Sequence, residues 1–295
     1  MTLKEYLAFV TSVETGSLSK AAEKLGATQS GVTHLILNME KELGFSVMTR
    51  NKSGVTLTKE GSRIFQTAKD IISGNEKVLA IASKIKGESS NKINIATFTS
   101  VAINWLPNII NGYQALHPEV EITITDGNYH DIKVALDEGV ADVGFVSLPF
   151  NADYKFHPLV KEKIYAVLPA NHPLKNLSAF PVERFAVEPV ISLPDNTDID
   201  YKRVFDQVGI TPNVKYRTND DHAMISMVEN NLGICLEPEL LLKGRNANVK
   251  ILETIPPSYR TIALAVPYEK QASPLTLDFA DYIIKWVKEN CDNSI

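Results

Sequence analysis

Polar side chains recur at helical spacing near the start of the sequence. Ser30, Thr33 and His34 are followed one turn later by Asn38, and Gln29 stands just before them. At about 100° per residue, these side chains fall on one face of a helix. Their amides, hydroxyls and imidazole can exchange hydrogen bonds with base edges, so the face suits the major groove of DNA. A helical hairpin with a solvated face gives the same spacing, so further residues are needed to decide.

Two short helices joined by a tight turn must hold this face. Gly26 is placed to end the first helix in the left-handed conformation, and the hydroxyl of Thr28 can cap the second. A preceding helix, predicted over residues 3–14, would pack against the pair. Apolar stripes at helical spacing are formed by Leu18, Ala21, Ala22 and Leu25 in the first helix of the pair and by Val32, Ile36, Met39 and Leu43 in the second.

A short basic loop follows, before an extended segment at residues 55–57. Arg50 and Lys52 lie in this loop. If the loop is the wing of a winged helix, both side chains would contact phosphates or an adjacent minor groove. A solvated turn is the alternative, and the preceding helices favour the wing.

Thr58 is placed to cap a long helix that we expect to reach residue 86. The apolar residues of this helix alternate spacings of four and three, as in a heptad seam that packs against a partner helix. The predicted seam contains Ile64, Ala68, Ile71, Asn75, Val78, Ala82 and Ile85. The long helix is therefore expected to mediate dimerisation.

The order of residues through the helix pair, the loop and the strand closely resembles the LysR-type transcriptional regulators. The resemblance is carried by Ala21, Ala22, Leu25, Thr28, Gln29, Ser30, Val32, Thr33, Ile36, Met39, Glu40, Leu43, Gly44, Val47, Met48, Arg50, Leu57, Thr58 and Gly61. Gly31, His34 and the pair Val47 and Met48 depart from the usual residues. The resemblance implies a winged helix-turn-helix that binds double-stranded DNA. The residues expected to contact DNA are Ser17, Thr28, Gln29, Ser30, Thr33, His34, Asn38, Arg50 and Lys52.

Beyond a small polar segment at residues 87–91, strands and helices alternate, which indicates a parallel α/β sheet. Strands are predicted at 92–97, 120–125, 142–147, 164–168, 189–193, 214–217, 234–236, 249–252 and 260–266, and helices at 101–116, 131–138, 201–208, 223–230 and 275–289. In the LysR family this region is a two-lobed domain similar to a periplasmic binding protein, and the resemblance implies the same here.

The expected fold class is therefore multidomain α/β, with a winged helix-turn-helix, a long linker helix and a two-lobed periplasmic-binding-protein-like domain. By analogy, the chain would cross to the second lobe near Glu162 and return near Leu264. The expected domains are 1–58 for DNA binding, 59–87 for the dimerisation helix and 88–295 for effector binding, with lobe I at about 91–162 and 265–295 and lobe II at about 163–264.

Ligands of open α/β sheets lie at the carboxyl ends of strands, beside helix N-termini. Several residues selected by this rule, such as Thr99 and Asn128, are equally well explained as helix caps. The LysR effector pocket uses hydroxyls near the positions of Thr99, Ser100 and Ser147, which favours these three. The predicted effector-binding residues are Thr99, Ser100, Val101, Asn128, Tyr129, Ser147, Leu148, Thr197, Asp198, Asp221 and His222.

The chemistry of these residues leaves the identity of the effector open. N–H groups and hydroxyls would hold a small organic acid or an inorganic anion. Against this, Asp198 and Asp221 would repel an anion if they face the cleft, and no arginine is clearly placed there.

Charge and cysteine content agree with a DNA-binding end joined to an acidic body. Up to Ser89 there are 12 Lys and Arg against 9 Asp and Glu, and beyond it 18 against 26. Cys235 and Cys291 lack metal-ligand spacing and suit a reducing compartment, so no metal or cofactor is expected. The sequence has no signal-peptide pattern and no apolar run long enough to span a membrane, so we expect a cytoplasmic protein.

The leading hypothesis is a transcriptional regulator that forms a homodimer or homotetramer. Its expected partners are double-stranded DNA, a small-molecule effector and a second copy of itself, with RNA polymerase as a further candidate and no membrane. An enzyme is the first alternative, since His130 with Asp131 and His222 with Asp221 could supply acid and base groups. No nucleophile elbow, phosphate loop or metal cluster supports it, so we expect no enzymatic activity. A cytosolic small-molecule binding protein is the second alternative.

Overall fold

The computed structural model describes residues 1–51, 54–86, 91–194, 199–244, 247–268, 272–291 and 295. The chain divides into two compact units, Met1–Lys86 and Gly87–Ile295, which are described separately below. In the described part of the chain, every helix is too short or too polar to cross a membrane.

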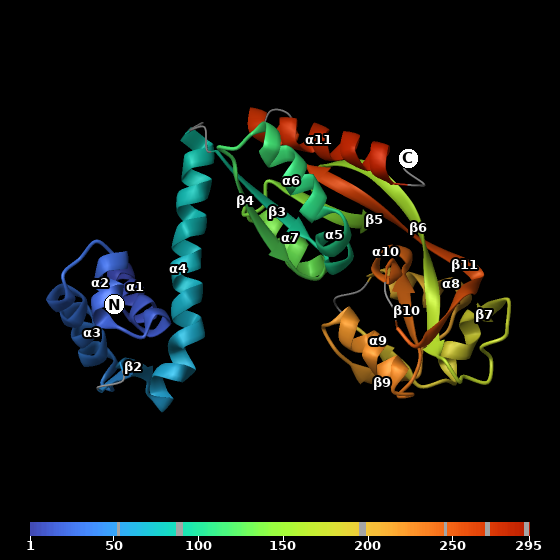
Figure 1. The fold of residues 1–295 in the computed structure, drawn as a ribbon, viewed down its shortest axis with the longest axis horizontal. Coiled ribbons are helices and arrows are strands. Elements are labelled where there is room, and N and C mark those ends of the chain that lie inside the picture. Colours follow the sequence, from blue (N-terminus) through green and yellow to red (C-terminus); the bar gives the residue numbers. More distant parts are fainter. Residues whose placement is uncertain (52–53, 87–90, 195–198, 245–246, 269–271, 292–294) are drawn as a thin grey trace. The chain divides into compact units, whose positions relative to one another are not determined.

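The first unit contains three short helices, a β-hairpin and a long helix (Figure 1). Thr28 caps the third helix as the sequence predicts, since its hydroxyl accepts from the Gly31 amide at 3.1 Å, and Gly44 ends the helix with a φ of 78°. The elements are α1 Leu3–Thr15, α2 Leu18–Lys24, α3 Gln29–Leu43, β1 Met48–Asn51, β2 Gly54–Leu57 and α4 Lys59–Lys86. Their common core includes Phe9, Ala21, Val32, Ile36, Met39 and Val47.

Close backbone contacts fix the hairpin against the helices. The Val55 amide donates to the Gly16 carbonyl at 2.9 Å. A Cβ atom on Gly61 would lie 1.9 Å from the Val47 carbonyl oxygen, so only glycine fits at the start of α4. The hairpin and the first turn of α4 are therefore built into the same small domain as α3.

The predicted seam of α4 divides into two parts. Ala68 is 2% exposed and packs, with Ile64, in the core of the first unit, so these two residues already have partners within the chain. Ile71 and Val78 are 39% and 63% exposed. The side chain of Ile85 lies outside the described residues. The seam available to a second helix is therefore shorter than the sequence pattern indicates.

The second unit has two lobes that share one sheet. Within the described residues, seven strands pair in the order β10-β6-β11-β5-β3-β4, with β7 beside β11. The elements are β3 Lys92–Thr97, α5 Thr99–Asn104, α6 Leu106–Leu116, β4 Glu121–Asp126, α7 Tyr129–Asp137, β5 Val143–Leu148, β6 Lys155–Pro169, β7 Ala179–Pro181, a 3-10 helix Val182–Ala186, β8 Val190–Ser192, α8 Ile199–Val208, β9 Val214–Arg217, α9 Asp221–Glu229, β10 Cys235–Pro238, α10 Glu239–Leu242, β11 Val249–Val266 and α11 Pro274–Asn290.

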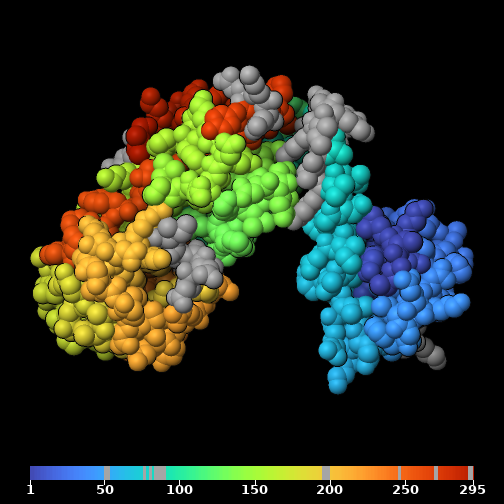
Figure 2. Space-filling view, turned by 180° about the vertical axis from the view of Figure 1, so that it is seen from behind, coloured from blue at the N-terminus to red at the C-terminus, as the bar shows by residue number. Residues whose placement is uncertain are grey.

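Each lobe has its own hydrophobic core. Strands β3, β4 and β5 of lobe I are parallel, as expected, whereas β11 is antiparallel to both β5 and β6. In Figure 2 the green surface of lobe I meets the yellow and orange surface of lobe II. The core of lobe I contains Ile95, Leu106, Phe145, Leu264 and Phe279, and that of lobe II contains Phe180, Phe185, Val190, Met224 and Leu236.

Two long strands, β6 and β11, run through both lobes (Figure 1). On β6, Val160 packs in the core of lobe I and Ile164 in that of lobe II, so the crossing lies around Glu162. On β11, Leu252 belongs to lobe II and Ile262 already to lobe I. The return crossing therefore precedes Leu264, and the two strands predicted at 249–252 and 260–266 are one strand with a register shift between Glu253 and Ser258.

The prediction of a single helix over residues 101–116 was wrong. The structure has two helices, α5 and α6, which meet at the buried Trp105. Pro107 is the second residue of α6. Proline has no N–H and its ring clashes with the carbonyl four residues earlier, so a continuous helix would be broken here. The break turns α5 into a short separate helix whose first residues reach the cleft.

Candidate functional site

The outer face of α3 presents the polar residues that the sequence places there. Gln29, Ser30, His34 and Asn38 are exposed, and Thr33 is half-buried. The opposite face is closed, because Val32, Ile36 and Met39 are fully buried in the core. The helix therefore offers one side to a partner outside the domain.

Two of the predicted DNA-contacting hydroxyls also serve as helix caps. Ser17 caps α2 by accepting from the Lys20 amide at 3.4 Å, and Thr28 caps α3. The capping interpretation therefore holds for both hydroxyls, whatever else they contact. In the wing, the side chain of Arg50 and the whole of Lys52 lie outside the described residues.

One residue of this face was missed by the sequence reasoning. Leu37 is 51% exposed and shares a hollow of the α3 surface with Gln29, Ser30, Thr33 and His34. An apolar side chain on this face can pack against a thymine methyl group. Leu37 stands three residues after His34 and four after Thr33, so the helical spacing already places it on this face, and only its apolar character hid it.

The second candidate site is a cavity of about 290 Å³ between the lobes. Its walls come from the ends of β3 and β4, the starts of α5, α7 and α9, and the middle of β11. The lining residues are Phe98, Thr99, Ser100, Asp126, Gly127, Asn128, Tyr129, Asp131, Leu193, Asp200, Tyr201, Asn219, Asp221, Pro238, Leu241 and Arg260.

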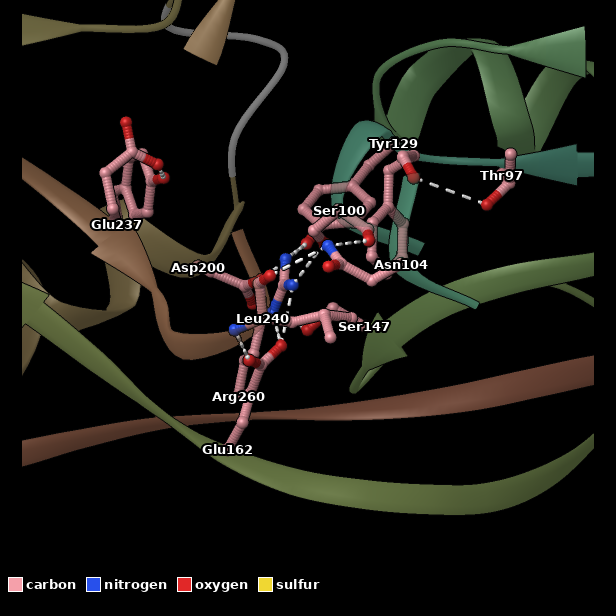
Figure 3. Close-up of polar contacts among 12 residues, drawn as sticks. Thr97, Ser100, Asn104, Tyr129, Ser147, Glu162, Asp200, Glu237, Leu240 and Arg260 are labelled. Atoms are coloured by element: carbon pink, nitrogen blue, oxygen red, sulfur yellow. Dashed lines mark hydrogen bonds and ion pairs between the residues drawn. The ribbon is translucent and has the colours of Figure 1, made fainter. Parts of the chain in front are cut away.

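A buried arginine lies at the centre of this cavity wall (Figure 3). Arg260 is 7% exposed, and its Nε and Nη2 lie 2.7 and 2.6 Å from Oε1 of Glu162. Nη2 also donates to the Ser100 hydroxyl at 2.7 Å, and Nη1 donates to the Tyr129 hydroxyl at 3.2 Å. Burial favours the neutral form, but Glu162, Tyr129 and Asp200 together outweigh burial, and the pKa of Arg260 is raised. The expectation that the cleft lacks an arginine was therefore wrong.

Asp200 joins the two lobes across the cleft. The Tyr129 hydroxyl donates to its Oδ2 at 2.6 Å, and the Ser147 hydroxyl donates to its Oδ1 at 2.8 Å. Arg203, one turn along α8, pairs with Asp200 at 3.0 Å and donates to the carbonyls of Leu148 and Pro149. These contacts tie the start of α8 in lobe II to the ends of strands in lobe I.

Asp221 faces the cavity from the start of α9. Its carboxylate accepts a hydrogen bond from Thr99, while burial raises its pKa, and Arg260, His222 and Thr99 offset part of that rise. The Nδ1 atom of the neighbouring His222 is buried without a hydrogen-bond partner among the described residues. Burial therefore makes ionisation of Asp221 at this wall of the cavity less favourable than ionisation of an aspartate in water.

The predicted effector residues fall into distinct groups. Thr99, Ser100, Asn128, Tyr129 and Asp221 line the cavity, and Asn128 also caps α7. Ser147 lies behind the wall on Asp200, while Leu148 and His222 are outside the lining. Val101 is fully buried in the core of lobe I because α5 turns it away from the cleft. Thr197 and Asp198 lie outside the described residues.

The most connected residues of the cleft, Arg260 and Asp200, were not predicted. Arg260 contacts groups that are 98, 131 and 160 positions away in the sequence. A short sequence motif cannot predict contacts between residues so far apart in the sequence. The available signal was an arginine at the first position of the strand predicted at 260–266, where a strand that crosses between lobes would face the cleft.

Comparisons with known proteins cover both units. Residues 3–62 match the model of the bacterial regulatory helix-turn-helix proteins of the lysR family, and residues 86–288 match the LysR substrate binding domain. An uncharacterized HTH-type transcriptional regulator of Bacillus subtilis, YvbU, is 30% identical over 92% of this chain and 94% of its own length.

Solved structures show the same fold. Full-length CbnR, crystallised in complex with its target DNA, matches with a TM-score of 0.63 and 16% identity, over 97% of this chain and 99% of its own. The regulatory domain of CcmR from Synechocystis PCC6803, in complex with 2-PG, matches with a TM-score of 0.62 and 19% identity, over 68% of this chain and 98% of its own. The chain belongs to the LysR family and is a transcriptional regulator with a helix-turn-helix domain and an effector-binding domain.

Proposed function

We propose that the outer face of α3 reads operator DNA in the major groove. The observation that carries this proposal is the contrast between the two faces of α3: Gln29, His34 and Asn38 are exposed, whereas Val32, Ile36 and Met39 are fully buried. Ser30, Thr33 and Leu37 extend the reading surface, and the amides at the start of α3 would meet a phosphate. Ser17, Thr28, Arg50 and Lys52 would contact the backbone beside it.

The protein acts as a dimer, or as a dimer of dimers, on an inverted repeat. Ile71, Val78 and Leu79 leave α4 with an apolar surface that is 39%, 63% and 60% exposed. A second copy of α4 would cover this surface, and two α3 helices would then read two half-sites. In this proposal the protein works in the cytoplasm, has no enzymatic activity and has RNA polymerase as a candidate partner.

The cavity between the lobes holds the effector. Thr99, Ser100, Tyr129, Asn128 and Asp221 supply its polar walls, and Asp200 and Ser147 connect the lobes beside it. A ligand that binds one arrangement of the lobes better than another shifts the population toward it, which is how the cleft would control DNA binding. The structure of CcmR with 2-PG supports a ligand site in this domain of the family.

In vitro selection from a random pool of double-stranded DNA tests the DNA-reading surface. The full chain should enrich an inverted repeat, and Gln29→Ala should weaken or abolish that enrichment. Gln66→Ala, at an exposed position of α4, is the matched control and should select the same sequence as the unchanged protein. Equal enrichment by Gln29→Ala and the unchanged protein would count against α3 as the reading helix.

A further inference from the structure

The charge of the cavity wall points to a class of effector. Asp126, Asp131, Asp200 and Asp221 line the cavity, and Arg260 is the one cationic lining side chain among the described residues. The wall therefore carries more negative than positive charge.

Arg260 has little left to offer an anion. A guanidinium has five N–H donors; three of these donate to Glu162, Ser100 and Tyr129, and Nη2 also lies 2.6 Å from Oε1 of Glu162. Its charge is balanced by Glu162, which is 4% exposed and pairs with it at 2.6 Å. A carboxylate or phosphate in the cavity would have to break these contacts and leave Glu162 without its cation.

Two of the carboxylates lack this kind of compensation. The other two have partners: Asp131 accepts from the backbone amide of Asn128 in the cap of α7, and Asp200 pairs with Arg203. Among the described residues, the two that lack it are Asp221 and Asp126. Asp221 has a hydroxyl donor, Thr99, but no salt-bridge partner among the described residues, and burial raises its pKa. Asp126, at the end of β4 on the solvent-facing rim, accepts from the Gly127 amide, and its pKa is likewise raised by burial. Arg260 lowers the pKa of Asp221 only from a distance, because its guanidinium is paired with Glu162, so neither Asp221 nor Asp126 has a salt bridge of its own among the described residues.

We propose that the effector is a small organic cation, whose ammonium or amidinium group is held by Asp221 with help from Asp126. This inference rests on the proposed effector role of the cavity, and it chooses a class of effector that differs from the small organic acid or inorganic anion considered from the sequence. Part of the cost of desolvating Asp221 is already present in the folded protein, so pairing with a cation regains interaction energy at less additional cost. The volume of about 290 Å³ is at the lower end for ligand pockets, so the cation is small.

Four probes with the same four-carbon skeleton separate the ligand classes: butane-1,4-diamine, 4-aminobutanoate, butane-1,4-diol and butanedioate. Each is added to the full chain at constant ionic strength, and unfolding is followed by tryptophan fluorescence. Trp105 and Trp286 are the only tryptophans and both lie in the second unit, so the signal reports the effector-binding domain. The diamine should raise the melting temperature most and the dianion least, because binding to the folded state stabilises it.

The variant Asp221→Asn should weaken diamine binding at least tenfold, whereas Asp137→Asn, an exposed and ion-paired position on α7, should leave it unchanged. The inference is overturned if butanedioate stabilises most, if none of the probes shifts the melting temperature, or if Asp221→Asn binds the diamine as well as the unchanged chain. An equal, Asp221-dependent shift with magnesium chloride would also overturn it, in favour of a metal ion. Selection of DNA by the same preparation shows separately whether the regulator function holds.

Discussion

The polar side chains on the outer face of α3 and those in the wall of the cleft differ in how many hydrogen bonds they make within the protein. On α3, His34 and Asn38 are exposed and make no side-chain hydrogen bond among the described residues, and Gln29 accepts one from Ser19. In the cleft, Arg260 and Asp200 are buried and bonded to several partners each. The exposed residues of α3 can form hydrogen bonds with DNA without breaking contacts that stabilise the fold. The bonded residues of the cleft contribute to stability, so a ligand that contacts them also changes stability.

The largest effect is expected for Arg260→Met. The substitution leaves Glu162 buried without its cation, which should lower the free energy of unfolding of the second unit by about 3–5 kcal/mol. Urea unfolding followed by tryptophan fluorescence measures this loss. Arg184→Met is the matched control, because Arg184 is exposed and its pair with Glu188 should contribute little. A loss as small as that of the control would mean that the arginine and the carboxylate are not coupled.

Tyr129→Phe should have a smaller effect on the same domain. It removes one hydroxyl that donates to Asp200 and accepts from Arg260, while keeping the ring against Phe98. Hydrogen bonds to charged groups contribute about 1.5–3 kcal/mol, so a loss of about 2 kcal/mol is expected. Tyr268→Phe, at a position 45% exposed, should leave the unfolding midpoint unchanged. If both variants unfold at the same urea concentration, Tyr129 does not connect the lobes.

The two polar residues of α3 should show the reverse behaviour. His34→Ala and Asn38→Ala should each weaken binding to the selected operator by about 1–2 kcal/mol, while unfolding changes by less than about 0.5 kcal/mol. Fluorescence anisotropy with labelled operator, compared with a scrambled duplex, measures the specific part. His130→Ala, at an exposed position on α7, is the matched histidine control. Loss of stability in parallel with loss of affinity would remove the contrast between the two regions.

The smallest effect is expected for Asp221→Asn, and it should depend on pH. Burial raises the pKa of Asp221 in the folded state. The contribution of Asp221 to stability is therefore greatest at a pH below its pKa in the unfolded chain, and it is lost as the pH rises through its pKa in the folded protein. Asparagine cannot ionise, so without ligand the variant should melt above the unchanged protein at pH 7 and approach it near pH 4. Asp137→Asn should show no such pH-dependent gain. A variant that melts lower at pH 7 would show that the ionised carboxylate stabilises the empty cleft.

The bounds and the polar outer face of α3 could be derived from the sequence because their determinants are local. These determinants lie within 17 consecutive residues: the Thr28 cap, the glycine at position 44, and the buried stripe of Val32, Ile36 and Met39. Each depends on residues no more than one or two helical turns away. The same is true of β3 and α7, whose bounds follow apolar runs and caps. Leu37, which is 51% exposed, was overlooked because it is apolar, although the same helical spacing places it on the polar face.

The cleft could be only partly derived, because its centre is assembled over long sequence distances. The rule that ligands lie at strand ends selected Thr99, Ser100, Tyr129 and Asp221, all of which line the cavity. It could not select Arg260, which lies in the middle of β11 and reaches the cavity only because that strand crosses between lobes. Whether the wall has a cation free to meet an anion depends on Arg260 and its partner Glu162, so the charge balance of the wall could not be read from the strand ends alone.

The shared strands also determine how the two lobes can move. Because β6 and β11 stay paired from the Val249 end to Val266, apart from register shifts, the lobes are joined by a hydrogen-bonded ribbon and not by two separate linkers. Such a ribbon resists sliding and stretching, and bending across its width is its softest deformation. The irregular segment between Glu253 and Ser258, beside the lobe crossing, lowers the bending stiffness there. An effector would therefore change the angle between the lobes by elastic flexing about this segment, with an amplitude set by the stiffness of two strands.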